Sequence, residues 1–167
     1  MKQTRNSLRR VNTGKRSEVA QTRYTVYGFV WARISQAKSH GFWLECIALC
    51  ESIIADRLEA MWAQLHQQSA NARNVRTAKQ TASLLKKRPG LEPEVNELCQ
   101  VICEWSDARN IAVHEMTKIL EGDNRSIEQK VNDLKHTSSA GVALARKVCR
   151  IIGPINKRLA TAGRTSI

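Results

Sequence analysis

The feature that most restricts the fold is a long run of apolar residues spaced three and four positions apart between residues 42 and 67. This spacing places them on one side of an α-helix, because 3.6 residues make one turn. A β-strand would instead need apolar residues at every second position. The run therefore predicts a helix with one buried side. That side carries Trp43, Ile47, Ile54, Leu58, Met61 and Leu65.

Four other segments show a similar helical spacing, and their ends carry the residues that usually begin and end helices. Ser126 and Gln129 have the spacing of a capping box, which starts a helix. Gly153-Pro154 is expected to stop or kink the last helix. The four predicted segments are 24–38, 77–87, one that begins near Pro93 and ends at Gly122-Asp123-Asn124, and one that begins at Ser126.

The chain is therefore predicted to be all-α, a bundle of four or five helices. Apolar residues make up 42% of it and aromatic residues only 5%, which suits a helical domain better than a β-sandwich. At 167 residues it can bury a core without metals or disulfides. We expect one domain over 23–160, a flexible basic segment over 1–22 and a flexible end over 161–167.

The net charge of +12 is concentrated near the two ends of the sequence. Residues 1–23 hold seven Lys and Arg against one acid, residues 134–167 hold seven and no acid, and 13 basic and 14 acidic residues lie between. This pattern favours a polyanion partner, such as a nucleic acid, over a basic surface that only aids solubility. Lys86-Lys87-Arg88 suit a phosphate contact and suit the carboxyl end of a helix equally well. The predicted nucleic-acid contacts are Arg9, Arg10, Lys15, Arg16, Lys86, Lys87, Arg88, Arg146, Lys147 and Arg150.

Several classes of protein find no support in the sequence. The first 16 residues contain no apolar signal-peptide core, and the longest apolar run, near Phe42 to Cys50, is too short to span a membrane. The odd number of cysteines suggests reduced thiols and a cytoplasmic location. No glycine-rich phosphate loop, Ser-His-Asp order or dense acidic cluster is present, so ATPases and metallonucleases are not favoured.

The segment 104–116 places Arg109, Asn110 and His114 within six residues. A guanidinium binds phosphate, and an imidazole exchanges protons near neutral pH. Arg109 lies on an apolar stripe, as does Glu51 in the helix predicted over 42–67, and a buried carboxylate needs a partner. We therefore expect the two to form an ion pair, which either holds the helices in register or orients Arg109 toward a phosphate. Asn110 and His114 are expected on a different side of the helix from Arg109.

These residues also resemble a known family. Arg109-Asn110-x-x-x-His114 is similar to the Arg-x4-6-His motif of the HEPN superfamily, whose nuclease members commonly carry a polar residue after the arginine. The segment 51–59, Glu-Ser-Ile-Ile-Ala-Asp-Arg-Leu-Glu, resembles the second-helix signature of bacterial HEPN toxins and abortive-infection proteins. Both pieces occur in the expected order, and the resemblance covers roughly residues 24 to 155.

The resemblance implies an HEPN-like homodimer in which two Arg/His sets line one cleft. It also implies a metal-independent endoribonuclease, a toxin or antiphage-defence effector restrained by an antitoxin protein, with no cofactor. In such an enzyme Arg109 stabilises the phosphorane, His114 acts as acid or base, Asn110 fixes the histidine or a phosphate oxygen, and Glu51 holds Arg109. The alternative is a non-catalytic HEPN-like module that binds RNA or a protein partner. A DNA-binding protein is a weaker third hypothesis, since no helix-turn-helix is evident.

The cysteines offer a different hypothesis. The pairs Cys46/Cys50 and Cys99/Cys103 each place two thiols on one side of a predicted helix, and two facing helices could offer four ligands to zinc or an iron–sulfur cluster. The spacing differs from the usual short Cys-x2-Cys pattern, and cysteines are common in helical cores. Packing is therefore the favoured interpretation of these residues, and no metal is expected.

Overall fold

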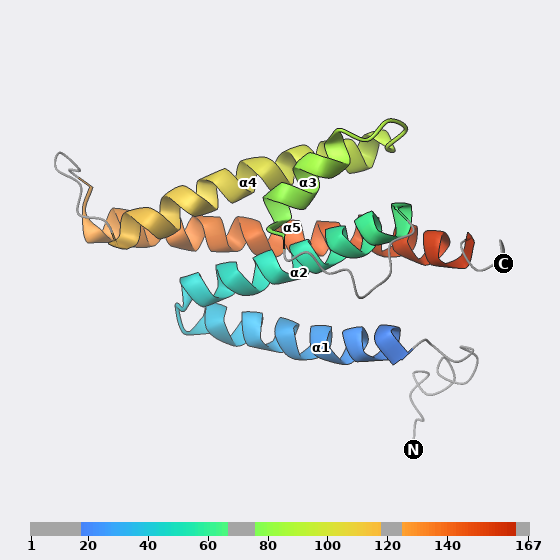
Figure 1. The fold of residues 1–167 in the computed structure, drawn as a ribbon. Coiled ribbons are helices and arrows are strands. Elements are labelled where there is room, and N and C mark those ends of the chain that lie inside the picture. The colour runs from blue at the N-terminus through green and yellow to red at the C-terminus, as the bar shows by residue number, and fades with distance from the viewer. Residues whose placement is uncertain (1–17, 67–75, 118–124, 163–167) are drawn as a thin grey trace, which may run out of the picture.

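The predicted all-α architecture is confirmed. A computed structural model describes residues 18–66, 76–117 and 125–162, and within these ranges it contains helices and no strand. Figure 1 shows the helices lying roughly side by side, with the short α3 crossing between two of them. The helices are α1 (Glu18–Ser39), α2 (Trp43–Leu65), α3 (Ala78–Lys86), α4 (Pro93–Thr117) and α5 (Ile127–Ala162).

The long helix α5 is the centre of the bundle. It packs against α2 and α4, while α3 fills the space between α2 and α4 and contacts both (Figure 1). α1 lies at the edge and packs mainly against α2. Most of the stripe predicted on α2 is buried, and only Trp43 and Leu65 at its two ends are partly exposed. Burying each large apolar side chain contributes about 1.5–3 kcal/mol. The largest fully buried side chains include Ile53, Ile54, Leu58, Leu85, Leu98, Ile102, Val148 and Ile152.

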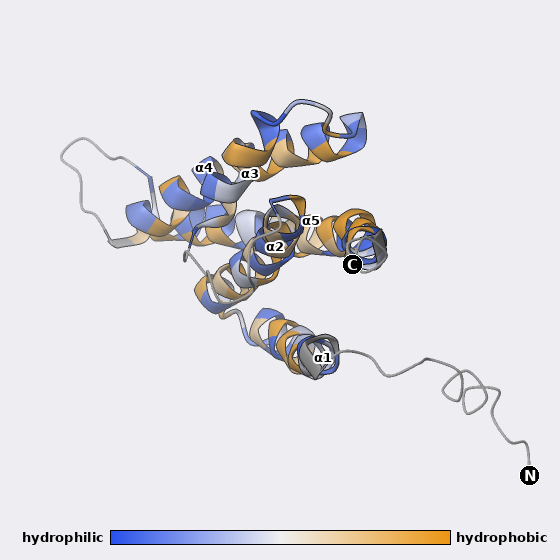
Figure 2. Cartoon of the chain, turned by 45° about the vertical axis from the view of Figure 1, so that its right-hand side comes forward, coloured by the Kyte–Doolittle hydropathy of each residue, from blue (hydrophilic) through white to orange (hydrophobic). Residues whose placement is uncertain are grey.

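Figure 2 shows that the apolar surfaces of α2, α3, α4 and α5 turn toward one another, and that polar residues cover much of the outside. The contact between α4 and α5 is unusually close at Gly141, where a Cβ atom would lie 2.7 Å from the ring of Trp105. The indole Nε1 of Trp105 donates a hydrogen bond to the backbone oxygen of Thr137 at 3.0 Å. A glycine on α5 therefore makes room for the largest side chain of α4.

The first helix begins earlier than its predicted start at Tyr24. It begins at Glu18, so part of the segment predicted to be flexible is helical. Arg23 forms a two-point ion pair with Asp56 of α2, and the Tyr27 hydroxyl donates to the same carboxylate at 2.7 Å. These contacts hold the first turns against α2. Phe29 of α1 is 73% exposed.

The last helix also differs from its prediction. The capping box is present, since the backbone N–H of Gln129 donates to the Ser126 hydroxyl and that of Ser126 donates to the Gln129 side chain. Gly153-Pro154 does not stop the helix, which continues to Ala162 with Pro154 on its exposed side. Ile155 and Asn156 are buried beyond the proline, and Asn156 donates to the backbone oxygen of Arg57 at 3.1 Å. Tertiary contacts thus outweigh the local effect of proline.

None of the described helices is both long enough and apolar enough to cross a membrane.

Candidate functional site

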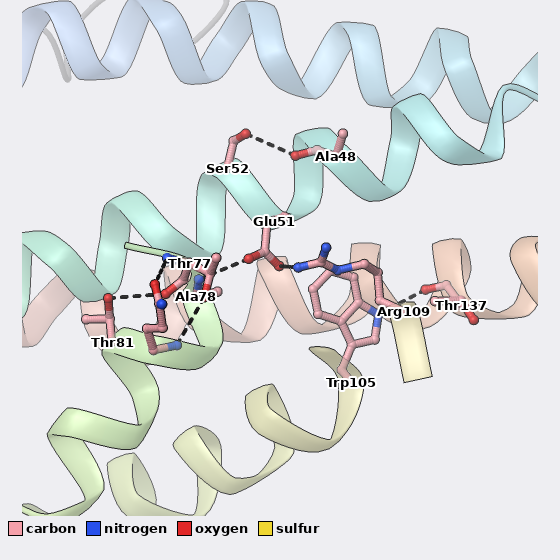
Figure 3. Close-up of polar contacts among 10 residues, drawn as sticks. Ala48, Glu51, Ser52, Thr77, Ala78, Thr81, Trp105, Arg109 and Thr137 are labelled. Carbon is pink, nitrogen blue, oxygen red and sulfur yellow. Dashed lines mark hydrogen bonds and ion pairs between the residues drawn. The ribbon is translucent and has the colours of Figure 1, made fainter. Parts of the chain in front are cut away.

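The predicted ion pair between Glu51 and Arg109 joins α2 to α4. Nη2 of Arg109 lies 3.1 Å from Oε2 of Glu51, and the two side chains are 23% and 17% exposed. Figure 3 shows the two side chains reaching toward each other from their helices. Little water reaches the pair, so its attraction is screened less than that of a surface pair.

A third helix takes part in the same contact. The backbone N–H of Ala78 donates to Oε1 of Glu51 at 3.0 Å (Figure 3). Ala78 is the first residue of α3, and the first N–H groups of a helix have no partner inside it. Thr77 caps the same end in a capping box with Gln80. Glu51 therefore binds the positive end of α3 and the guanidinium of α4 with its two oxygens, a contact that sequence analysis did not predict.

Arg109 and His114 face different sides of α4 within one chain. They are five residues apart, which corresponds to about 140° around a helix axis. Arg109 extends to Glu51, whereas His114 is exposed and Asn110 is half-buried. Asn110 and His114 are four apart and share a side, as predicted. One chain does not turn the guanidinium and the imidazole toward the same place, so a joint site needs a second chain.

The outer side of α4 carries exposed apolar side chains beside the exposed carboxylates of Glu104 and Asp107. Val101 is 39% exposed and Ile111 is 57% exposed, and Ala108 and His114 are exposed on the same helix. Spacings of three and four residues bring Ala108 and Ile111 to the same side as His114. This surface, defined by Glu104, Asp107, Ala108, Ile111 and His114, is called the outer α4 surface below.

The predicted nucleic-acid contacts are divided between two regions. Lys86 ends α3 and binds the Gln100 side chain, Lys87 is exposed, and Arg88 follows directly. On α5, Arg146, Lys147 and Arg150 are exposed, and the Arg146 guanidinium lies 5.9 Å from the centre of the Trp31 ring. The structure does not gather these two groups on one helix. Arg9, Arg10, Lys15 and Arg16 lie outside the described residues.

The cysteines pack inside the bundle. Cys46, Cys50 and Cys99 are fully buried, and Cys103 is half-buried with its sulfur 3.6 Å from the Ser83 hydroxyl. A hydrogen bond from Cys50 lowers the pKa of Cys46, and the same contact raises the pKa of Cys50. Burial raises the pKa of Cys99 to about 12. Among the described residues, no three His, Cys, Asp or Glu side chains are grouped so as to hold a metal ion.

The structure brings together a second arginine and histidine that sequence analysis did not connect. Nη1 of Arg88 lies 3.4 Å from Nε2 of His66, and the His66 ring stacks on Trp62 with ring centres 3.8 Å apart. The spacing of four between Trp62 and His66 was the available signal for the stack. Arg88 is distant in sequence, and only the folded position of α3 brings it close.

Comparison with protein-family models, with curated proteins and with solved structures returned no match. The functional argument therefore depends on the side chains and their arrangement.

Proposed function

We propose that the chain is a metal-independent endoribonuclease of the HEPN type that acts as a homodimer. The observation that supports this most is the ion pair of Glu51 with Arg109, 3.1 Å long and partly exposed, on the helix that also carries Asn110 and His114. The carboxylate fixes the guanidinium in place without burying it completely. A fixed, partly exposed guanidinium is suited to stabilising a charged phosphorane.

The proposed reaction uses the 2′-hydroxyl of RNA as the nucleophile. His114 removes the proton of this hydroxyl, a bond forms between O2′ and phosphorus, and the bond from phosphorus to O5′ breaks. The departing 5′-oxygen takes up a proton, and the products are a 2′,3′-cyclic phosphate and a 5′-hydroxyl. Arg109 stabilises the negative charge of the phosphorane, while Asn110 orients the imidazole or a phosphate oxygen. No metal-activated water is needed.

The position of these groups supports a homodimer. Arg109 and His114 differ by about 140° around α4, so a phosphate held between them must lie between two chains. The outer α4 surface carries the exposed Ile111, with 57% of its area accessible, and apolar side chains of this kind are suited to a contact between copies. In the proposed dimer, Arg109 of one chain and His114 of its partner contact the same phosphate.

The test is cleavage of RNA by the purified protein in the presence of EDTA. We expect cleavage to persist in EDTA and to fall by roughly 100-fold or more in His114→Ala and in Arg109→Ala, as for loss of an acid–base or oxyanion-stabilising group. His136→Ala changes an exposed histidine on α5 and serves as the control. Cleavage that EDTA abolishes, or that His114→Ala leaves intact, contradicts the proposal.

The proposal includes a cellular role as a toxin or antiphage-defence effector in the cytoplasm, restrained by an antitoxin protein. Its support is the similarity of residues 51–59 and of the Arg109/His114 motif to such proteins. Expression of the chain alone is expected to arrest growth, and His114→Ala to relieve the arrest.

A second candidate function is a non-catalytic helical module that binds RNA or a protein partner. The neutralisation of Arg109 by Glu51 favours it, because a paired guanidinium at 23% exposure also fits a purely structural role. Binding of RNA without cleavage, unchanged in His114→Ala, supports this candidate.

A further inference from the structure

A basic hollow beside the end of α2 lies apart from the Glu51–Arg109 pair. Trp62, His66, Leu84, Lys87, Arg88 and Pro89 line this hollow, and its volume is about 410 Å³. A second hollow of about 710 Å³ adjoins it, because Leu84 and Lys87 line both. The other side chains of the second hollow are Arg76, Thr77, Lys79, Gln80 and Ser83. Both volumes lie in the range of roughly 300–1,000 Å³ found for small-ligand sites.

The two hollows, called here the α3 groove, carry positive charge. Arg76, Lys79, Lys87 and Arg88 line them, and no carboxylate is among the described lining residues. Some of this charge is compensated from outside the groove, since Arg76 lies 3.7 Å from Glu59 and Lys79 pairs with Asp107. Lys87 is exposed, and the described contact of the Arg88 side chain is with an uncharged nitrogen of His66. The groove therefore favours a ligand with negative charge.

His66 is held in one orientation beside Arg88. Its Nδ1 lies 2.9 Å from the backbone oxygen of Trp62, and its Nε2 lies 3.4 Å from Nη1 of Arg88. A carbonyl oxygen only accepts and a guanidinium only donates, so the proton is on Nδ1 and the lone pair of Nε2 faces Arg88. A guanidinium has five N–H donors, and this contact uses one of them, so Arg88 can bind a phosphate while it keeps its contact with the ring.

One side of the α3 groove is formed by two stacked aromatic rings, and the outer ring is exposed to solvent. The His66 ring stacks on Trp62 at an angle of 27° with 3.8 Å between centres, and the Arg76 guanidinium lies 5.6 Å from the centre of the same indole. His66 is exposed, so the ring side that does not contact Trp62 can accept a further flat group. Unpaired bases stack on aromatic side chains in this way, and cations beside the stack bind the phosphates.

We infer that the α3 groove binds single-stranded nucleic acid. An unpaired base stacks on His66, and the adjoining phosphates contact Arg88 and Lys87, with Arg76 beside the Trp62 indole. A duplex fits less well, since its bases are already stacked and cannot reach the imidazole. The inference does not depend on cleavage at Arg109 and His114, because the groove would hold the strand in either case.

Fluorescence anisotropy with a labelled 2′-O-methyl oligouridylate tests the inference, since this strand lacks the nucleophile and cannot be cleaved. We expect Arg88→Gln to weaken binding by roughly tenfold, because charge-assisted contacts to phosphate are strong. Lys38→Gln removes the same charge from an exposed site in the last turn of α1, next to the start of α2 and away from the groove, and is expected to change binding by less than about twofold. Equal losses in the two variants would mean that only overall charge matters, which overturns the inference.

Two variants of His66 separate stacking from charge. His66→Ala removes the ring and is expected to weaken binding by roughly fivefold or more, whereas His66→Phe keeps a flat ring and is expected to retain most of the affinity. If both variants lose the same affinity, or if the protein binds a blunt duplex as tightly as the single strand, an unpaired base does not stack on His66. Similar affinity for a matched oligothymidylate supports recognition of phosphate and base without the 2′-hydroxyl. His136→Ala, on α5, should leave binding unchanged, and because binding is measured with a strand that cannot be cleaved, failure of the nuclease and failure of the groove are distinguishable.

Discussion

Glu51 is the residue on which three helices depend. One carboxylate oxygen accepts the N–H of Ala78 at the start of α3, and the other contacts Arg109 of α4 at 3.1 Å. Removal of the carboxylate would leave two groups without their partner: the half-buried guanidinium of Arg109 and the N–H of Ala78. Such uncompensated groups cost more than the pair itself contributes, because each loses water on folding.

We therefore expect Glu51→Ala to lower the free energy of unfolding by about 2 kcal/mol, a partial value for a pair that is not fully buried. Glu51→Gln keeps an acceptor for Ala78 and is expected to lose about half as much. Urea denaturation measures both. The control is Glu92→Ala, which breaks the pair with Arg158, whose side chains are 56% and 68% exposed. If Glu92→Ala lowers the free energy of unfolding as much as Glu51→Ala does, the conclusion that Glu51 holds three helices together is wrong.

One physical cause explains why the Glu51–Arg109 pair could be predicted from the sequence and the Arg88–His66 contact could not. Glu51 and Arg109 each interrupt an apolar stripe, and burial penalises an unpaired charge, so a sequence pattern was enough to match them. Arg88 and His66 lie on polar positions where no such penalty applies. Their contact depends on the position of α3 between α2 and α4, which helical spacing does not specify.

At the scale of the helices, α4 and α5 are held at a close distance by one pair of residues. Trp105 fits against Gly141, where a Cβ atom would lie 2.7 Å from its ring. Both residues are buried, and the indole is fixed by its hydrogen bond to Thr137. A larger residue at 141 must therefore push the helices apart or displace the indole.

Gly141→Ala is expected to reduce the free energy of unfolding by about 1–3 kcal/mol through overpacking. The matched control is Gly28→Ala in the middle of α1, where nothing lies within 4 Å of the added atom. That change should raise stability by about 0.5–1 kcal/mol, because alanine favours a helix more than glycine does. Thermal and urea unfolding compare the two variants. An increase in stability for Gly141→Ala would show that the helices are not held at this distance.

Helix number and class follow from spacing, while helix ends follow from contacts that spacing does not reveal. The predicted α2 begins and ends within a few residues of the observed helix, since its apolar stripe is strong. The start of α1 depends on Asp56, which lies 29 residues from Tyr27 and 33 from Arg23. Likewise α5 passes Pro154 because buried residues on both sides of it hold the helix in place. Proline does disfavour a helix locally, but the packing of the residues around it contributes more.

At the scale of the whole molecule, the proposed nuclease requires two chains. Ile111→Glu places a charge in the outer α4 surface, so we expect it to convert the dimer to a monomer and to reduce RNA cleavage in parallel. Light scattering after size-exclusion chromatography measures the mass, and a cleavage assay on the same samples measures activity. Phe29→Glu alters an equally prominent exposed side chain on α1 and is the control. A wild-type monomer that cleaves RNA at every concentration would exclude the dimeric site.

The edge position of α1 has a consequence for how the bundle opens. The other four helices share the buried interior around α5, whereas α1 is attached mainly to α2, with Asp56 receiving both Arg23 and Tyr27. Separation of α1 would expose Ile34 and Ala37, which are buried, but it would still cost less free energy than unfolding the whole bundle. Two carboxylates of α2 thus hold this outer helix in place, Asp56 near its start and Glu45, which binds Arg33, near its end.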